Sequence, residues 1–163
     1  MEIQRAGVAD APVIARLNRD AQRLHAEAHG QLFKPAGAGD EIAAWFAAAL
    51  EKPDTHALIG TVDGEAIGYI CGQIARYQEN PFRYASAIGL VDHLSISPAF
   101  QRRGYGDALL DALLAIFRDA GVARLELSVW AFNENARRFY ERRGFVMAQQ
   151  RMNLALGEAD LLA

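Results

Sequence analysis

The amino-acid sequence predicts one globular domain of mixed α/β architecture, with helices on both faces of a sheet. Three observations carry this prediction. The chain has 163 residues, 52% hydrophobic and 23% charged, enough for one domain to bury its own core. Apolar residues alternate with period two on both sides of Asp63-Gly64, which is typical of a hairpin with a two-residue turn. A strand pattern ending at Ile96 is followed by a tight loop and by leucines at helical spacing.

The first half of the chain predicts a strand, two helices and the hairpin. Residues 1–5 form a short strand, and Asp10-Ala11-Pro12 supplies an N-cap candidate and a first-turn proline for a helix. Glycines and prolines predict a loop from 25 to 40, before a second helix over about 40–50.

The second half predicts a strand–helix–strand unit and then a helix and further strands. The helix spans about 104–120 and stops at Gly121, and residues 125–129 alternate as a strand. A short helix over 133–143 stops at Gly144, and residues 145–156 predict one or two final strands. The order of elements gives a mixed sheet, with the strand–helix–strand unit parallel and right-handed.

Composition excludes several classes of protein. A net charge of −3, with the charges mixed along the chain, gives no field favouring nucleic acid or an anionic membrane. No segment resembles a signal peptide or a membrane span, so we expect a cytoplasmic protein. The lone cysteine, Cys71, is expected to be a buried small side chain, and the four scattered histidines predict no metal site.

The loop between the Ile96 strand and the following helix is a predicted anion site. Residues 101–106 read QRRGYG, so glycines allow a sharp turn that presents backbone N–H groups at the positive end of a helix. A dinucleotide fingerprint is the competing interpretation, with Glu126 as the ribose acid. It is disfavoured because Leu109 replaces the third glycine and a hairpin comes before the strand. A nucleoside-triphosphate loop lacks its Gly-Lys-Ser/Thr.

Two motifs together resemble the GNAT superfamily of acetyl-CoA-dependent N-acetyltransferases. Residues 101–106 match its pyrophosphate-binding signature, [Gln/Arg]-x-x-Gly-x-[Gly/Ala]. Residues 133–145 resemble its second signature, an asparagine five residues before Tyr140 and a Gly-Phe four residues after it. The resemblance implies a mostly antiparallel central sheet with helices on both faces and a splayed central parallel strand pair, in one domain spanning 1–163.

The resemblance also implies which residues bind acetyl-CoA. Main-chain groups of one strand would pair with the pantetheine arm, backbone N–H groups of the loop would hold the pyrophosphate, and an asparagine would contact the cofactor. The residues are Leu94 and Ile96 for the strand, Arg102, Arg103, Gly104, Tyr105, Gly106 and Asp107 for the loop, and Asn135. Asn133 is the better helix N-cap candidate.

Asp92 and Tyr140 are the predicted catalytic residues. By period-two alternation Asp92 shares a face with Ile88, Leu90, Leu94 and Ile96, an apolar setting that raises the pKa of a carboxyl and suits a general base or an ammonium-binding acid. His93, expected on the opposite face, and an ordered-water relay are the alternatives for the base. The structural alternatives for Asp92 are an ion pair with an arginine and exposure by a bulge. Within the family, the Ile96 N–H would stabilise the oxyanion and Tyr140 would protonate the leaving thiolate. The alternative for Tyr140 is a packing role beside Phe139 and Phe145.

The acceptor site carries no signature. His25, Glu27 and His29 stand near the end of the first helix, where they line the substrate site or form a solvated surface, and Trp45, Phe46, Phe82 and Tyr84 are cleft or core aromatics. The predicted function is direct acetyl transfer from acetyl-CoA to a primary amine of a small molecule, peptide or protein, without metal. The alternative is a non-catalytic acyl-CoA-binding module. A homodimer would use the final strands and the Leu161-Leu162 tail.

Overall fold

The computed structural model describes residues 1–37 and 39–154. The helices and strands in chain order are β1 (Glu2–Ala6), α1 (Ala11–Ala28), α2 (Gly39–Leu50), β2 (Thr55–Val62), β3 (Glu65–Tyr77), β4 (Ser86–Ile96), α3 (Tyr105–Asp119), β5 (Arg124–Leu127) and α4 (Glu134–Arg142). Short 3₁₀ turns, Val8–Asp10 and Pro98–Phe100, precede α1 and follow β4. In the described part of the chain, no helix is both long and apolar enough to cross a membrane.

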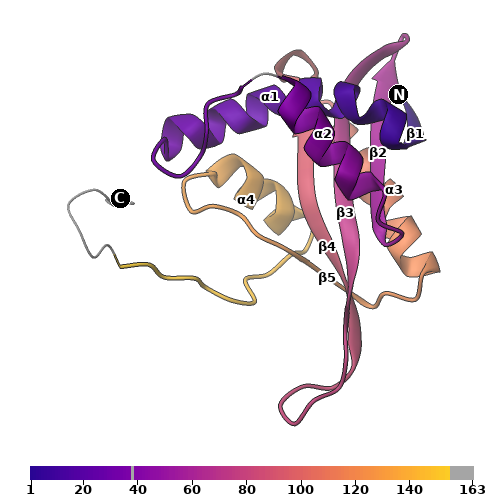
Figure 1. The fold of residues 1–163 in the computed structure, drawn as a ribbon, viewed down its shortest axis with the longest axis vertical. Helices are drawn as coiled ribbons and strands as arrows, with labels where there is room; N and C mark the ends of the chain where they lie inside the picture. The colour runs from indigo at the N-terminus through magenta and orange to yellow at the C-terminus, as the bar shows by residue number, and fades with distance from the viewer. Residues whose placement is uncertain (38, 155–163) are drawn as a thin grey trace.

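The strands form one sheet in the order β1-β2-β3-β4-β5, antiparallel up to β4, with β5 parallel to β4 (Figure 1). The predicted hairpin turn is confirmed, since Asp63 and Gly64 both have positive φ, 50° and 80°, as a type I′ turn requires. The parallel pair and the mixed sheet are likewise as predicted.

Helices cover both faces of the sheet (Figure 1). On one face, Ile14 and Leu17 of α1 and Phe46 of α2 pack on Ile59 and Tyr69. On the other face, a second core is built around α3 and inward-facing residues of β2, β3 and β4, including Leu58, Ile70, Val91, Leu110, Leu113 and Phe117. Burial of these two apolar layers fixes α1 and α3 on opposite sides of β4.

A β-bulge interrupts β4 and corrects the predicted alternation. The register with β3 shifts between Cys71, opposite His93, and Gly72, opposite Val91, so Asp92 is the extra residue. Asp92 is exposed, which confirms the alternative of a bulge that exposes it. Val91, Leu94 and Ile96 all pack on the α3 side. His93 instead contacts Phe46, which covers the α1 and α2 side.

The bulge changes which side chains share a face. Asp92 bonds Gln73 on the α1 and α2 side, where His93 also lies. The alternation had predicted that Leu94 and Ile96 share a face with Asp92 and that His93 lies on the opposite face. Both predictions are wrong. Both candidate bases lie on one side of the sheet because a bulge rotates the strand by one residue.

The parallel pair separates soon after it forms. Residues 88–91 of β4 pair with residues 124–127 of β5, while β4 continues five residues farther, to Ile96. The predicted splay is thus present, but among the described residues β5 is at the edge of the sheet, so the parallel pair is not central as predicted.

The prediction of one or two final strands is wrong for residues 145–154, which have no strand structure. Val146, Met147, Met152 and Leu154 are 78–87% exposed. Alternation indicates which side chains a strand would bury, but a strand also needs an edge to pair with, and this segment leaves the sheet. Among the described residues β5 is thus an edge strand. Residues 155, 156, 161 and 162 lie outside the described part.

Candidate active site

A cleft opens where β5 departs from β4. It is lined from α1, β3, β4, the segment after β5, and α4. Its polar and aromatic lining residues are Asn18, His25, Tyr69, Asp92, His93, Ser128, Trp130, Asn133 and Tyr140. Both predicted catalytic residues, Asp92 and Tyr140, therefore line one cleft.

Asp92 and His93 have different surroundings within the cleft. The Gln73 Nε2 group donates to Oδ2 of Asp92 at 3.0 Å. Desolvation raises the pKa of Asp92 from its ordinary value, and that hydrogen bond opposes the rise. The His93 ring packs against Trp45, Phe46 and Tyr69, and burial, aided by His25, lowers its pKa. His93 is accordingly a neutral imidazole at neutral pH.

Tyr140 packs against neighbouring rings and also faces the cleft, and its role as proton donor stays a prediction. Its ring packs edge-on against Phe139 at 5.0 Å and Phe145 at 5.4 Å between centroids, and it also lines the cleft. Burial raises the pKa of Tyr140 to about 12, so its hydroxyl keeps its proton at all physiological pH values.

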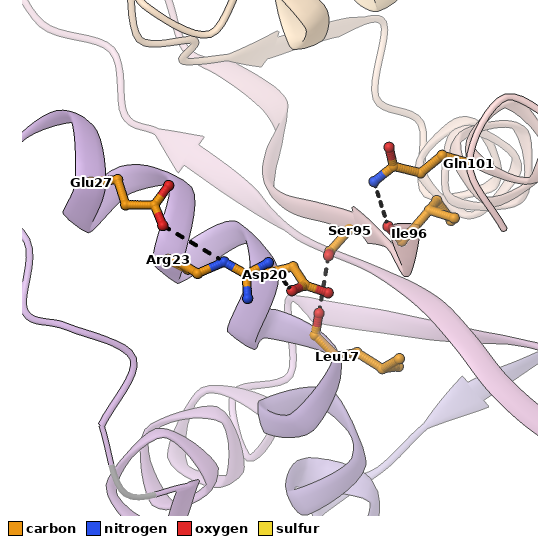
Figure 2. Close-up of polar contacts among 7 residues, drawn as sticks. All are labelled: Leu17, Asp20, Arg23, Glu27, Ser95, Ile96 and Gln101. Carbon is orange, nitrogen blue, oxygen red and sulfur yellow. Dashed lines mark hydrogen bonds and ion pairs between the residues drawn. The ribbon is translucent and has the colours of Figure 1, made fainter. Parts of the chain in front are cut away.

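The loop from β4 to α3 has the backbone of an anion site. Arg102 and Gly104 have positive φ, 59° and 82°, and Gly104 is the N-cap of α3. Among the described side chains none caps this helix, so its first N–H groups face outward. The Gln101 amide donates to the carbonyl oxygen of Ile96 at 2.9 Å, which ties the loop to the end of β4 (Figure 2).

The main chain of β4 leads from this loop into the cleft. Ser97 donates its N–H to Ile67 of β3 at 2.8 Å. Because backbone groups of alternate residues point to opposite edges of a strand, the N–H groups of Leu94 and Ile96 point away from β3, into the splay.

Charges around the loop are compatible with an anionic ligand. Arg102 and Arg103 are exposed. The carboxylate of Asp107 lies 3.7 Å from Arg143, which also pairs with Asp111. Arg143 thus offsets negative charge at the start of α3 and ties it to the end of α4.

Of the two asparagines of the second motif, Asn133 is confirmed as the helix cap, and the cofactor contact of Asn135 stays a prediction. Oδ1 of Asn133 accepts from the N–H of Ala136 at 3.1 Å and caps α4. Asn135 lies exposed on the first turn of the same helix.

Buried hydrogen bonds fix α1 beside the cleft. Ser95 Oγ donates to the carbonyl oxygen of Leu17 at 3.0 Å (Figure 2), and the Tyr69 hydroxyl donates to Asn18 Oδ1 at 2.7 Å. Sequence reasoning missed Asn18, Tyr69 and Trp130 as lining residues. An aromatic residue in the short segment between β5 and α4 was the available signal for Trp130.

The residues suggested for the acceptor side divide into three groups. His25 lines the cleft, and His29 packs against Trp130 beside it. Glu27 instead lies 3.9 Å from Arg23 on the exposed surface of α1, where Arg23 also pairs with Asp20 (Figure 2).

The suggested aromatic residues lie outside the lining. Trp45 and Phe46 stand behind His93. Phe82 and Tyr84, 99% and 86% exposed, lie between β3 and β4 in the projecting hairpin and not in the cleft.

Cys71 is buried, as predicted, and burial raises the pKa of its thiol to about 12. Such a thiol is a poor nucleophile. Across residues 1–37 and 39–154, no group of three His, Cys, Asp or Glu side chains is arranged to hold a metal ion.

Comparison with known families decides the identity of this arrangement. The model of the acetyltransferase (GNAT) family matches residues 15–145, which include both motifs and the lining residues of the cleft. The chain belongs to the GNAT family. The resemblance stated from the two motifs is thereby confirmed.

Curated relatives of this GNAT protein match a limited region. A mycothiol acetyltransferase of Beutenbergia cavernae is 43% identical over 60 residues, 37% of this chain and 20% of the relative. One of Propionibacterium freudenreichii is 42% identical over 57 residues, 35% of this chain and 18% of the relative. The match thus spans about a fifth of the length of these relatives.

Solved structures resemble the GNAT protein over nearly its whole length. The tetramutant of the BH1408 protein from Bacillus halodurans has a TM-score of 0.86 at 24% identity, covering 96% of this chain and all of the other. The aminoglycoside N-acetyltransferase AAC(6')-Iy in complex with CoA has a TM-score of 0.74 at 16% identity, covering 94% and 93%. At these identities the likeness establishes the fold.

Proposed function

We propose that this protein transfers the acetyl group of acetyl-CoA to a primary amine by direct attack. The observation that carries the proposal is the splay, where the N–H groups of Leu94 and Ile96 lie between the loop at Gly104 and the cleft that holds Asp92 and Tyr140. One continuous track therefore connects an anion site to a proton acceptor and a proton donor.

The anionic end of acetyl-CoA binds the loop and its thioester arm follows β4. Backbone N–H groups from Arg102 to Asp107 hold the pyrophosphate, because charge-assisted bonds to N–H groups at a helix start are strong. The main chains of Leu94 and Ile96 pair with the pantetheine amides as a strand would. Asn135, exposed on the first turn of α4, contacts the cofactor.

Asp92 binds the acceptor ammonium and takes its proton. An alkylammonium with a pKa near 10.4 is neutral in about one molecule in 2,500 at pH 7, and only the neutral amine attacks a thioester. Although Asp92 is exposed, partial desolvation still raises the pKa of its carboxyl, which makes it a stronger base than a fully solvated carboxylate. His93, neutral and on the same face, is the second candidate for this role.

Ile96 and Tyr140 stabilise the negative charge that develops on the carbonyl oxygen and on the leaving sulfur. As the amine nitrogen bonds the acetyl carbon, the Ile96 N–H donates to the carbonyl oxygen that becomes negative. The carbon–sulfur bond then breaks, and the Tyr140 hydroxyl donates its proton to the departing sulfur. The Tyr140 phenolate takes the extra proton of the acetylated nitrogen, and Asp92 releases its proton to solvent, which leaves a neutral amide and a free thiol. With a pKa of about 12, Tyr140 is a weak acid, so the proton moves as the bond breaks.

Release of free thiol tests this function directly. Purified protein, acetyl-CoA and a panel of primary amines should release coenzyme A thiol at a rate that saturates with both substrates. If acetyl-CoA binds and no amine in a broad panel accelerates thiol release, the chain is a binding module and the proposal is wrong.

A further inference from the structure

Five rings pack against one another beside the cleft, and we call them the ring cluster. They come from the end of α1, the following turn, and the segment between β5 and α4: His25, His29, Phe33, Trp130 and Phe132. The contacts that join histidine to aromatic rings, and Phe33 to Trp130, have centroids 5.0–5.6 Å apart and interplanar angles of 50–81°. Edge-to-face packing of this kind is favourable. The cluster therefore joins two segments about one hundred residues apart in the sequence and forms one side of the cleft.

Two members of the ring cluster line the cleft itself. Trp130 is 38% exposed and, like His25, belongs to the cleft lining. An indole face that is open to a cleft binds apolar groups, and it binds cations more strongly than the other aromatic side chains do.

His25 also presents a hydrogen-bond acceptor. Its Nδ1 lies 2.7 Å from the carbonyl oxygen of Ala21. Because a carbonyl oxygen can only accept, Nδ1 carries the proton, and in the neutral ring Nε2 holds a lone pair. The His25 ring therefore offers that lone pair to a donor such as an amine, while Phe33 and Phe132 pack against it.

The charge of the cleft limits the number of ammonium groups it can bind. Among the described residues that line it, Asp92 is the one carboxylate. Binding several ammonium groups out of water requires several carboxylates or equivalent partners. The lining suits one ammonium attached to an apolar body.

We propose that the ring cluster is the acceptor-binding wall and that it selects a monoamine with an aromatic body. The ammonium lies between the Asp92 carboxylate and Nε2 of His25, and the ring of the acceptor lies on Trp130. This inference rests on the proposed acetyl transfer and names the class of its acceptor.

The test compares three acceptors in the thiol-release assay: 2-phenylethylamine, ethanolamine and kanamycin. The wild type should have a kcat/KM for 2-phenylethylamine at least about tenfold above those for ethanolamine and kanamycin, the scale of one aromatic contact. Trp130→Ala should lower kcat/KM for 2-phenylethylamine about tenfold and that for ethanolamine less than about twofold. Phe82→Ala, which removes an exposed aromatic residue outside the cleft, should change neither.

A second variant guards against a general loss of structure. His25→Phe keeps a ring against Phe33 and Phe132 but removes Nε2, so it should lower kcat/KM for both monoamines alike, by about tenfold, at unchanged KM for acetyl-CoA. Preference for kanamycin, or an equal effect of Trp130→Ala on every amine, would overturn the inference while acetyl transfer stands. If none of the three amines, nor any of a broader panel, is acetylated, acetyl transfer itself fails.

Discussion

Replacing Gly104 by leucine separates the two demands on this residue, its backbone conformation and its proximity to the ligand. Gly104 has φ of 82°, and an added Cβ meets no atom within 4 Å. The substitution therefore costs only backbone strain, about 1–2 kcal/mol for an L-residue in the left-handed region. For a domain of this size that lowers Tm by about 2–8 °C. Leucine is chosen because it is not branched at Cβ.

Gly121→Leu is the matched control. Gly121 ends the same helix, has φ of 75°, and likewise has nothing within 4 Å of an added Cβ. Its strain cost should equal that of Gly104→Leu, so thermal melts of the two variants should shift by similar amounts. At Gly104 the leucine side chain additionally obstructs the N–H groups at the start of α3.

The expected difference is in acetyl-CoA binding. A hydrogen bond between a backbone N–H and a charged phosphate contributes about 1.5–3 kcal/mol, so losing one raises the Kd and KM for acetyl-CoA at least about tenfold. Calorimetric titration and saturation kinetics measure both constants. Equal constants for the two variants would refute the assignment of the loop as the pyrophosphate site.

Three further substitutions test the catalytic cleft. Tyr140→Phe keeps the ring contacts with Phe139 and Phe145, so acetyl-CoA binding should stay within about twofold while kcat falls roughly tenfold to a thousandfold; an unchanged kcat returns Tyr140 to packing alone. Asp92→Asn should lower kcat/KM for the amine at least about tenfold. Its pH–rate profile should also lack the fall in rate that the wild type shows as the pH drops through the raised pKa of Asp92. If Asp92→Asn keeps this fall and His93→Gln loses it, the base is His93. Because burial lowers the pKa of His93, the folded state favours the neutral ring, and the resulting stability is present above pH 6.5 and is lost as the pH falls toward the lowered pKa. His93→Gln should therefore lose less unfolding free energy between pH 7 and 5 than the wild type. Equal losses in denaturant titrations would contradict this.

Short-range patterns predicted most elements and the anion loop. The Asp63-Gly64 turn, the strand to Ile96 and the glycines at 104 and 121 depend on local backbone preferences that neighbouring residues determine. The same holds for Asn133 as the cap of α4. These features required no knowledge of which strands pair.

The errors arose where pairing between distant segments decides the outcome. The bulge at Asp92 follows from the register of β4 against Cys71 and Gly72, and strict alternation cannot reveal it. An alanine Cβ at Gly72 would lie 2.4 Å from the carbonyl oxygen of Leu90, so close approach of the two strands at this point requires glycine. The catalytic role of Asp92 stays a prediction, while the structure places Asp92 and His93 on one face of the sheet, where strict alternation had placed them on opposite faces.

The ring cluster could not be predicted from the sequence for the same reason. His25 and Trp130 belong to segments that meet only because α1 lies over one face of the sheet and the chain after β5 turns beneath the end of that helix. No spacing within either segment indicates the contact. The proposed acceptor wall therefore depends on tertiary contacts, whereas the proposed pyrophosphate loop consists of six consecutive residues.

The most direct measurement of acetyl transfer is the mass of the product formed from isotopically labelled acetyl-CoA. With purified protein and 2-phenylethylamine, mass spectrometry should detect the amine carrying one labelled acetyl group, formed in equal amount to the thiol released, and Tyr140→Phe should form it more slowly. Thiol release with no labelled amide on any amine tested would contradict the proposed function.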